Sequence, residues 1–238
     1  MKSINTLLKS ISNKKLLVIF PHPDDETVMT SGLIAQAVEK GWDVKVVSVT
    51  NGSLGQIHVH GHGRNIVRIR RHELQRALRI LGVTDFEMWR HADGYLKELR
   101  PWRSEVTKLI KSYNPGVIVS YGPDGVSGHP DHLALGQQVF KNWLQNQDTV
   151  LLWPSFKNTV LNYLEEKTQT AERIVPPTYI VKLSPKNTKQ KILALQAHKS
   201  QDLANPLKWL EAEQTEYFAR ATLGKKYDYS FIAFDLGI

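Results

Sequence analysis

Short runs of aliphatic and β-branched residues alternate along this chain with longer segments in which apolar residues recur at helical spacing. The strand-like runs are residues 16–20, 44–49 and 117–120. The segments of helical period are residues 27–41, 65–82 and 104–114. Strands that alternate with helices in this way form a parallel sheet with helices on both of its faces. The sequence therefore predicts an α/β, Rossmann-like fold with a mostly parallel sheet.

The pattern becomes less regular after Asp148, but it continues. Further strands are expected at residues 149–156, 159–166 and 178–184. Further helices are expected at residues 185–201 and 206–224. Because the sequence of 238 residues contains no repeat and no convincing linker, we expect a single domain over 1–238, in which residues 150–238 complete the substrate side.

Each of the three strand-like runs is followed by a polar segment. "PHPDDE" follows the first run, "TNGSLGQIHVHGHG" the second and "YGPDGVSGHPDH" the third. In an open α/β sheet, ligands bind outside the carboxyl ends of the strands, near the point where the strand order reverses. We therefore expect the three segments to meet at one edge of the sheet.

Two of these segments contain the same His-Pro-Asp motif. The chain has no cysteine, so any transition-metal site must use His, Asp or Glu. His22 and Asp25 are spaced i, i+3, as are His129 and His132. Proline favours the first turn of a helix, so a helix that begins at Pro130 would place both of its neighbouring histidines on one side. This pairing indicates a metal site more strongly than either motif alone, which could be an acidic turn with a capping aspartate.

A catalytic zinc ion is usually held by three protein ligands and a water. The predicted ligands of Zn²⁺, or of Fe²⁺ or Co²⁺ in its place, are His22, Asp25 and His132. Asp24 is the expected general base for the water that the metal activates. His129 is expected to protonate a leaving amine or to stabilise the oxyanion, and Asp131 to orient a histidine ligand.

A second set of histidines offers an alternative metal site. On a strand, His58, His60 and His62 would lie on one face and could bind a metal by themselves. The glycines around them and the lack of a nearby carboxylate base favour a mobile flap or a substrate contact instead. Solvated loop histidines are the remaining interpretation.

The formal net charge of +8 raises the question of an acidic partner. Much of it comes from one segment, in the arginines Arg64, Arg68, Arg70, Arg71, Arg76 and Arg79. Their spacing is typical of the solvated face of an amphipathic helix, so we do not expect nucleic acid as a partner. A basic nucleic-acid-binding module stays the alternative from another functional class.

The motifs closely resemble those of the LmbE-like, or PIG-L, deacetylases. "PHPDDE" and "GHPDH" carry the resemblance, which continues through "RRHELQRALRILGV", "HADGYL", "NPGVIVSYGPDG" and "KILALQAHKSQ". It covers most of residues 15–202. Members of that family are zinc-dependent enzymes of Rossmann-like fold that deacetylate N-acetylglucosamine derivatives. The resemblance implies the same zinc ligands, base and acid as those assigned above.

The resemblance also implies substrate contacts that the residues alone do not indicate. It implies that Arg70 and Asp93 hold sugar hydroxyls, and that Glu73 orients Arg70. Gln201 belongs to a matching His-x-Ser-Gln pattern and is expected near the substrate. The chain departs from the family at Ser53, where an acidic residue is common, and this puts the accepted substrate in question.

We therefore expect a zinc-dependent hydrolase that removes the acetyl group from an N-acetylglucosamine-type amino sugar or its conjugate. The positive net charge of the chain favours an anionic conjugate as substrate, with Arg64, Arg68 or Arg71 as residues that contact it. Alternatives are a metal-dependent amidase on a larger amide such as a thiol conjugate, and a phosphate ester hydrolase. The apolar runs are too short for a signal peptide or a membrane span, so we expect a cytoplasmic protein without membrane contact. The sequence leaves open whether the protein forms a homo-oligomer.

Overall fold

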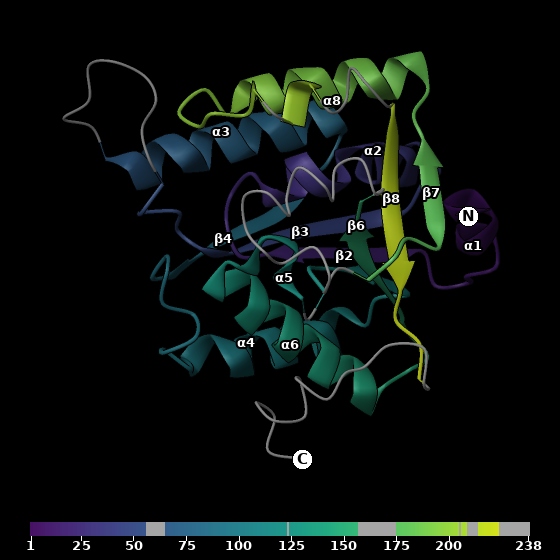
Figure 1. Cartoon of the computed structure of the whole chain (residues 1–238), viewed down its shortest axis with the longest axis horizontal. Coiled ribbons are helices and arrows are strands. Elements are labelled where there is room, and N and C mark those ends of the chain that lie inside the picture. Colours follow the sequence, from purple (N-terminus) through teal and green to yellow (C-terminus); the bar gives the residue numbers. More distant parts are fainter. Residues whose placement is uncertain (56–64, 123, 157–174, 205, 209–213, 224–238) are drawn as a thin grey trace.

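The structure is a computed structural model of the whole chain, and it describes residues 1–55, 65–122, 124–156, 175–204, 206–208 and 214–223. The described strands form one eight-stranded sheet (Figure 1). In spatial order its strands are β1 (Lys2–Ser3), β7 (Tyr179–Lys182), β8 (Thr215–Arg220), β6 (Val150–Ser155), β5 (Val117–Val119), β2 (Lys15–Phe20), β3 (Asp43–Thr50) and β4 (Asp85–His91).

The sheet is mostly parallel. Only β8 runs antiparallel to its neighbours, β6 and β7, and the other pairs of strands are parallel. From β2 the chain moves outward through β3 and β4, and then returns to the other side of β2 with β5 and β6. The strand order therefore reverses between β2 and β5, which is the place where such folds bind ligands. The predicted Rossmann-like fold is confirmed.

Helices cover both faces of the sheet. The described helices are α1 (Ile4–Lys9), α2 (Asp25–Glu39), α3 (Ile66–Leu81), α4 (Pro101–Tyr113), α5 (Gly125–Gly128), α6 (Pro130–Gln145) and α8 (Pro185–Ala197). In Figure 1, α3 and α8 lie side by side above the sheet with α2, and α4 and α6 lie below it. Each layer of helices packs on its own apolar core.

Strand β2 explains why the core has two layers. Leu16, Val18 and Phe20 point into the core under α2, α3 and α8. Leu17 and Ile19 point to the opposite face and pack with residues of α4 and α6. Successive side chains of a strand point to opposite faces, so a central strand that is apolar at every position must be covered twice.

Two expectations for the sheet were wrong or incomplete. The helix predicted over 206–224 is wrong at Thr215–Arg220, which forms β8 because both of its edges find strand partners. Strand β4 was not predicted, because it pairs on one side only and alternates charged with apolar residues. The strand predicted at 159–166 lies outside the described residues.

Among the described helices, none is both long and apolar enough to cross a membrane.

Candidate active site

The described parts of the three polar segments meet at the carboxyl edge of the sheet, beside the reversal of strand order. Thr50 N–H donates to Pro21 O at 2.8 Å, which ties the end of β3 to the loop after β2. Tyr121 O–H donates to Asp25 Oδ1 at 2.7 Å, which ties the loop after β5 to the same place. The expected convergence is therefore present.

His22, Asp25 and His132, the three predicted metal ligands, lie side by side. His22 Nδ1 is 3.3 Å from Asp25 Oδ2 and 3.3 Å from His132 Nε2. His132 Nε2 is 3.6 Å from Asp25 Oδ1. A tetrahedral zinc ion with bonds of about 2.0–2.1 Å separates its ligand atoms by about 3.4 Å. Each distance is close to that separation, with Asp25 Oδ2 facing His22 and Asp25 Oδ1 facing His132. Two imidazole nitrogens and a carboxylate are donors of the kind that a divalent metal ion takes.

The opposite ring nitrogen of His22 faces two carboxylates. His22 Nε2 lies 3.1 Å from Asp93 Oδ1 and 3.3 Å from Asp131 Oδ2. Asp131 is held in turn, because it accepts hydrogen bonds from Gly94 N–H at 2.7 Å and Leu96 N–H at 2.9 Å. Metal-binding histidines commonly have a carboxylate on their second nitrogen, which fixes the ring. Asp131 and Asp93 both lie beside this nitrogen, and the orienting role of Asp131 stays a prediction.

Among the described residues, two groups of three offer ligand atoms that all lie close together; both contain His22, and neither contains Asp25. One combines His22 with His129 and His132, and the other combines it with Asp93 and Asp131, with ligand atoms within 4.8 Å of one another in each group.

Burial lowers the pKa of His22, but Asp131, Asp25 and Asp93 outweigh that effect and raise it well above its usual value. Surroundings that favour a cationic imidazole also favour a bound metal cation.

His132 is oriented by contacts on both sides of its ring. Its Nδ1 lies 3.1 Å from Gly125 O, so its Nε2 faces His22 and Asp25. Its ring stacks on Tyr121, with ring centroids 4.0 Å apart. Burial lowers the pKa of His132 to about 4, which favours the neutral form of the ring. Tyr121 was not singled out in the sequence, although its place directly after β5 could have indicated it.

His129 is partly exposed at the mouth of the cluster. It is the N-cap of α6, where its Nδ1 accepts a hydrogen bond from Asp131 N–H at 3.2 Å, and Pro130 occupies the first turn as expected. Its ring centroid lies 4.8 Å from that of His22 and 4.9 Å from that of His132. Burial and the nearby His22 lower its pKa. His129 is thus adjacent to the candidate metal site.

Asp24 is held by Arg70. Asp24 Oδ2 lies 3.0 Å from Arg70 Nη2. Burial raises the pKa of Asp24 to about 6, against the opposing effect of the Arg70 cation. Arg70 is buried and also donates to Gly52 O and Pro23 O, both at 3.1 Å. A Cβ atom on Gly52 would lie 2.8 Å from the guanidinium, so the glycine permits this close approach.

The His-x-Ser-Gln segment lies behind the site. Ser200 donates to the Glu73 carboxylate through its N–H at 2.8 Å and its hydroxyl at 2.7 Å, and Gln201 Nε2 donates to Ser200 Oγ at 2.9 Å. The expectation that Glu73 orients Arg70 is wrong, because Glu73 binds Ser200 while Arg70 pairs with Asp24. The two partners come from α3 and from the turn that follows α8, a contact that sequence spacing does not reveal.

Two buried residues of the first turn of α2 were missed in the sequence. Glu26 accepts a hydrogen bond from Asp24 N–H at 3.1 Å, and Thr27 donates from its hydroxyl to Glu26. Thr27 Oγ1 also lies 3.2 Å from His198 Nε2. Burial raises the pKa of Glu26 to about 8 and lowers that of His198 to about 3. The only sequence signal was a third acid directly after Asp25.

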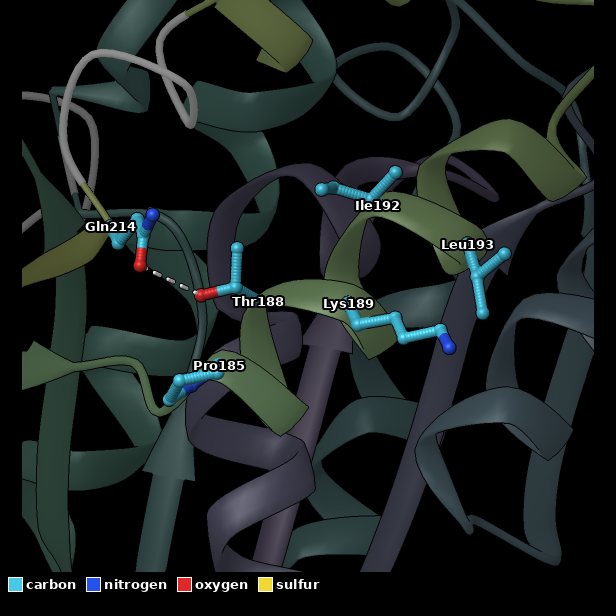
Figure 2. Close-up of a pocket in the computed structure, with 6 residues that line it drawn as sticks. All are labelled: Pro185, Thr188, Lys189, Ile192, Leu193 and Gln214. Atoms are coloured by element: carbon cyan, nitrogen blue, oxygen red, sulfur yellow. Dashed lines mark hydrogen bonds between the residues drawn. The ribbon is translucent and has the colours of Figure 1, made fainter.

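The sequence also singled out a histidine loop and the arginines of a helix. His58, His60, His62 and Arg64 fall outside the described residues, so the flap interpretation stays a prediction. The arginines of α3 that are exposed, as expected for an amphipathic helix, are Arg68, Arg71, Arg76 and Arg79. An open depression on the outer face of α8 is lined by Pro185, Thr188, Lys189, Ile192, Leu193 and Gln214 (Figure 2), none of them a predicted site residue.

Several known proteins with similar sequences or structures are deacetylases. The family model for PIG-L, GlcNAc-PI de-N-acetylase, matches residues 17–143, just over half of the chain. A probable N-acetyl-alpha-D-glucosaminyl L-malate deacetylase 2 from Bacillus anthracis is 28% identical over 195 residues, which cover 80% of this chain and 82% of that protein.

Two further proteins are similar over different shares of their length. A 1D-myo-inositol 2-acetamido-2-deoxy-alpha-D-glucopyranoside deacetylase from Corynebacterium glutamicum (strain R) is 29% identical over 150 residues, 53% of this chain and 52% of that protein, so the chain spans about half of it. N,N'-diacetylchitobiose deacetylase from Pyrococcus horikoshii has the same fold, with a TM-score of 0.70, 20% identity and coverage of 94% and 90%. The family model matches more than half of the chain, and the chain has the fold of a known deacetylase. This chain therefore belongs to the PIG-L family of de-N-acetylases, hydrolases that act on amides.

Proposed function

We propose that this chain is a divalent-metal-dependent hydrolase that removes the acetyl group from an N-acetylglucosamine conjugate. The observation that carries the proposal is the convergence of His22 Nδ1, Asp25 and His132 Nε2, separated by 3.3–3.6 Å, beside Asp24 and His129. Sequence similarity to deacetylases of N-acetylglucosamine conjugates supports the substrate class.

His22, Asp25 and His132 would hold the metal, and Zn²⁺ is the proposed ion. A cation bound there supplies Lewis acidity, which polarises an amide carbonyl and lowers the pKa of a water. Asp131 keeps Nδ1 of His22 turned toward the site by facing its Nε2. Tyr121 fixes the Asp25 carboxylate by donating to its Oδ1.

Asp24 is the proposed general base. Its carboxylate is adjacent in sequence to a proposed ligand but pairs with Arg70, and burial raises its pKa to about 6. A base with a pKa near the working pH is ionised enough to take a proton and basic enough to keep it. Asp24 would therefore remove a proton from the attacking water.

His129 is the proposed partner of the developing oxyanion or of the leaving amine. Its ring lies beside those of His22 and His132, on the exposed side of the cluster. A group there can donate a hydrogen bond or a proton as the tetrahedral intermediate forms and collapses. The products would be acetate and a free amino sugar.

Arg70, Asp93 and Gln201 are the proposed substrate contacts. Asp93 is buried beside His22 and accepts a hydrogen bond from Leu54 N–H at 2.9 Å, so it joins the site to the loop after β3. Gln201 extends from the end of α8 toward the same loop, since a Cβ atom on Gly55 would lie 3.2 Å from its Oε1. We further propose one domain over 1–238, in which residues 150–238 complete the substrate side, because β6, β7 and β8 belong to the common sheet.

A product assay tests the proposal. The purified protein is incubated with N-acetylglucosamine, its malate and inositol conjugates, chitobiose, a thiol conjugate joined through a larger amide and a phosphate ester. We expect equal amounts of acetate and free amine from at least one N-acetylglucosamine conjugate, and no phosphate from the ester. Cleavage of the larger amide alone, or phosphate release alone, would contradict the proposed substrate class.

A further inference from the structure

Asp24 has an unusual conformation for the first residue of a helix. It is the N-cap of α2, where an aspartate normally turns its carboxylate onto the first free N–H groups of the helix. Asp24 makes no such bond, and its φ of 156° and ψ of −25° are uncommon for a residue other than glycine. Its carboxylate meets Arg70 instead, at 3.0 Å. Neighbouring groups must hold the backbone in this conformation.

Glu26 provides that support. Its Oε2 accepts the Asp24 N–H at 3.1 Å, an N–H that His22 O also accepts at 3.1 Å, so the carboxyl group reaches back over the turn to the N-cap residue. Its other oxygen accepts the hydroxyl of Thr27, and Thr27 lies 3.2 Å from Nε2 of His198. Glu26 is 1% exposed, Thr27 0% and His198 1%. Two hydrogen bonds therefore hold this carboxyl group in a buried site with little freedom to move.

The contact has a direct consequence for the Asp24 carboxylate. Without Glu26, the Asp24 N–H keeps only the tight i, i+2 contact with His22 O, and Asp24 can relax to the usual N-cap conformation, which turns its carboxylate onto the N–H groups of α2. That movement would take the carboxylate away from Arg70 and from the proposed ligands. The geometry of the base thus depends on a residue that is not itself close to a reacting atom.

We propose that Glu26 is the positioning residue for Asp24: it holds the Asp24 backbone so that the carboxylate points into the site and not onto the helix. The inference rests on the proposed function, because it requires Asp24 to be the base. Glu26 acts through Asp24 and makes no contact with substrate.

The first experiment compares Glu26→Leu, Glu26→Gln and Ser31→Ala on the substrate that the product assay identifies. Glu26→Leu removes the carboxyl acceptor and leaves the Asp24 N–H with His22 O alone, so kcat falls about 100-fold, the size of effect that a small misplacement of a catalytic group produces. KM and bound metal stay within about threefold. Glu26→Gln keeps an acceptor oxygen and restores most of kcat. Ser31→Ala, which removes a buried hydroxyl of the same helix that donates to Thr27 O, leaves kcat unchanged.

A double-mutant cycle separates positioning from general damage. If Glu26 acts only through Asp24, the double variant Asp24→Asn/Glu26→Leu loses no more activity than Asp24→Asn alone. Losses that multiply would overturn the inference. If Asp24→Asn keeps the wild-type kcat, the proposed base is wrong and the inference falls with it. If Asp24→Asn is inactive and Glu26→Leu is normal, only the inference is overturned.

Hydrogen exchange of the Asp24 amide supplies a readout that needs no activity. Because His22 O also accepts this N–H, the comparison is between proteins with and without the Glu26 acceptor. The inference predicts an amide that is protected in the wild type and in Glu26→Gln and that exchanges faster in Glu26→Leu. Fast exchange in the wild type, or equal protection in all three proteins, would show that the Glu26 contact does not hold the backbone, and would overturn the inference.

Discussion

Three consecutive acids after Pro23 point in three directions. Asp24 meets Arg70, Asp25 meets His22, His132 and Tyr121, and Glu26 turns back onto the backbone. This separation allows three adjacent carboxyl groups to have different surroundings, and therefore different proposed roles. The pKa of Asp24 is raised, while that of Asp25 is lowered, because nearby His132 and His22 outweigh its burial.

The proposed ligand set can be tested one residue at a time. Asp25→Ala should lower metal affinity by at least about 100-fold, more than the loss of an outer partner usually costs. His129→Ala should bind metal with nearly normal affinity but turn over slowly. Metal titrations of the two variants by calorimetry check this. A weaker metal affinity in His129→Ala than in Asp25→Ala would instead support the group of His22, His129 and His132.

At the residue scale, the paired His-Pro-Asp motifs made the cluster predictable. Both motifs contain histidine and aspartate, which can bind a metal, and both follow a strand. The segments that follow parallel strands meet at one edge of the sheet. The contact of Asp93 with His22 was not predictable, because Asp93 comes from a loop whose path depends on the unpredicted strand β4. The Ser200 partner of Glu73 was missed because it is distant in sequence.

Helix α2 carries the proposed base and one ligand, and a buried ion pair anchors its middle. Glu216 of β8 accepts hydrogen bonds from Gly32 N–H at 2.7 Å and Leu33 N–H at 2.9 Å. Lys191 of α8 pairs with Glu216 at 2.6 Å and donates to Val28 O at 3.0 Å. A Cβ atom on Gly32 would lie 3.0 Å from the Glu216 carboxyl group, so the glycine permits this approach. Three elements are thereby joined.

Loss of one charge from this pair should destabilise the fold strongly. Glu216→Gln leaves Lys191 buried and unpaired, which costs about 3–5 kcal/mol of unfolding free energy. The matched control is Lys186→Met, whose exposed pair with Glu39 contributes about 0–1 kcal/mol. Urea unfolding of both variants measures the difference. Equal losses in the two variants would contradict the anchoring role of Glu216.

At the element scale, the sequence indicates most helices and strands but not their neighbours. Strands β2, β3 and β5 were predictable because each is an apolar run that is buried on both faces. Residues 215–220 were assigned to a helix because their local pattern suits one, yet they form β8 between β6 and β7. Tertiary pairing overrides local propensity at such positions.

At the scale of the whole molecule, the fold brings the predicted ligands together from residues about a hundred positions apart. The reversal of strand order between β2 and β5 places the loop with His22 beside the first turn of α6, which contains His132. The fold class follows from the alternation of strands and helices, and the family from the motifs. The identity of the conjugated sugar depends on loop contacts that neither feature determines, so it belongs to the product assay.

The central claim is that a metal held by His22, Asp25 and His132 and a base at Asp24 together hydrolyse the acetamide. The most direct measurement is turnover, titrated against bound Zn²⁺ after chelation, for the wild type and for Asp24→Asn. We expect wild-type turnover to rise with metal and level off at about one ion per chain, as one three-ligand site requires. Asp24→Asn should bind the same amount of metal with kcat lower by about 10²–10⁴-fold. Turnover that is independent of bound metal, or an Asp24→Asn variant as active as the wild type, would contradict the account.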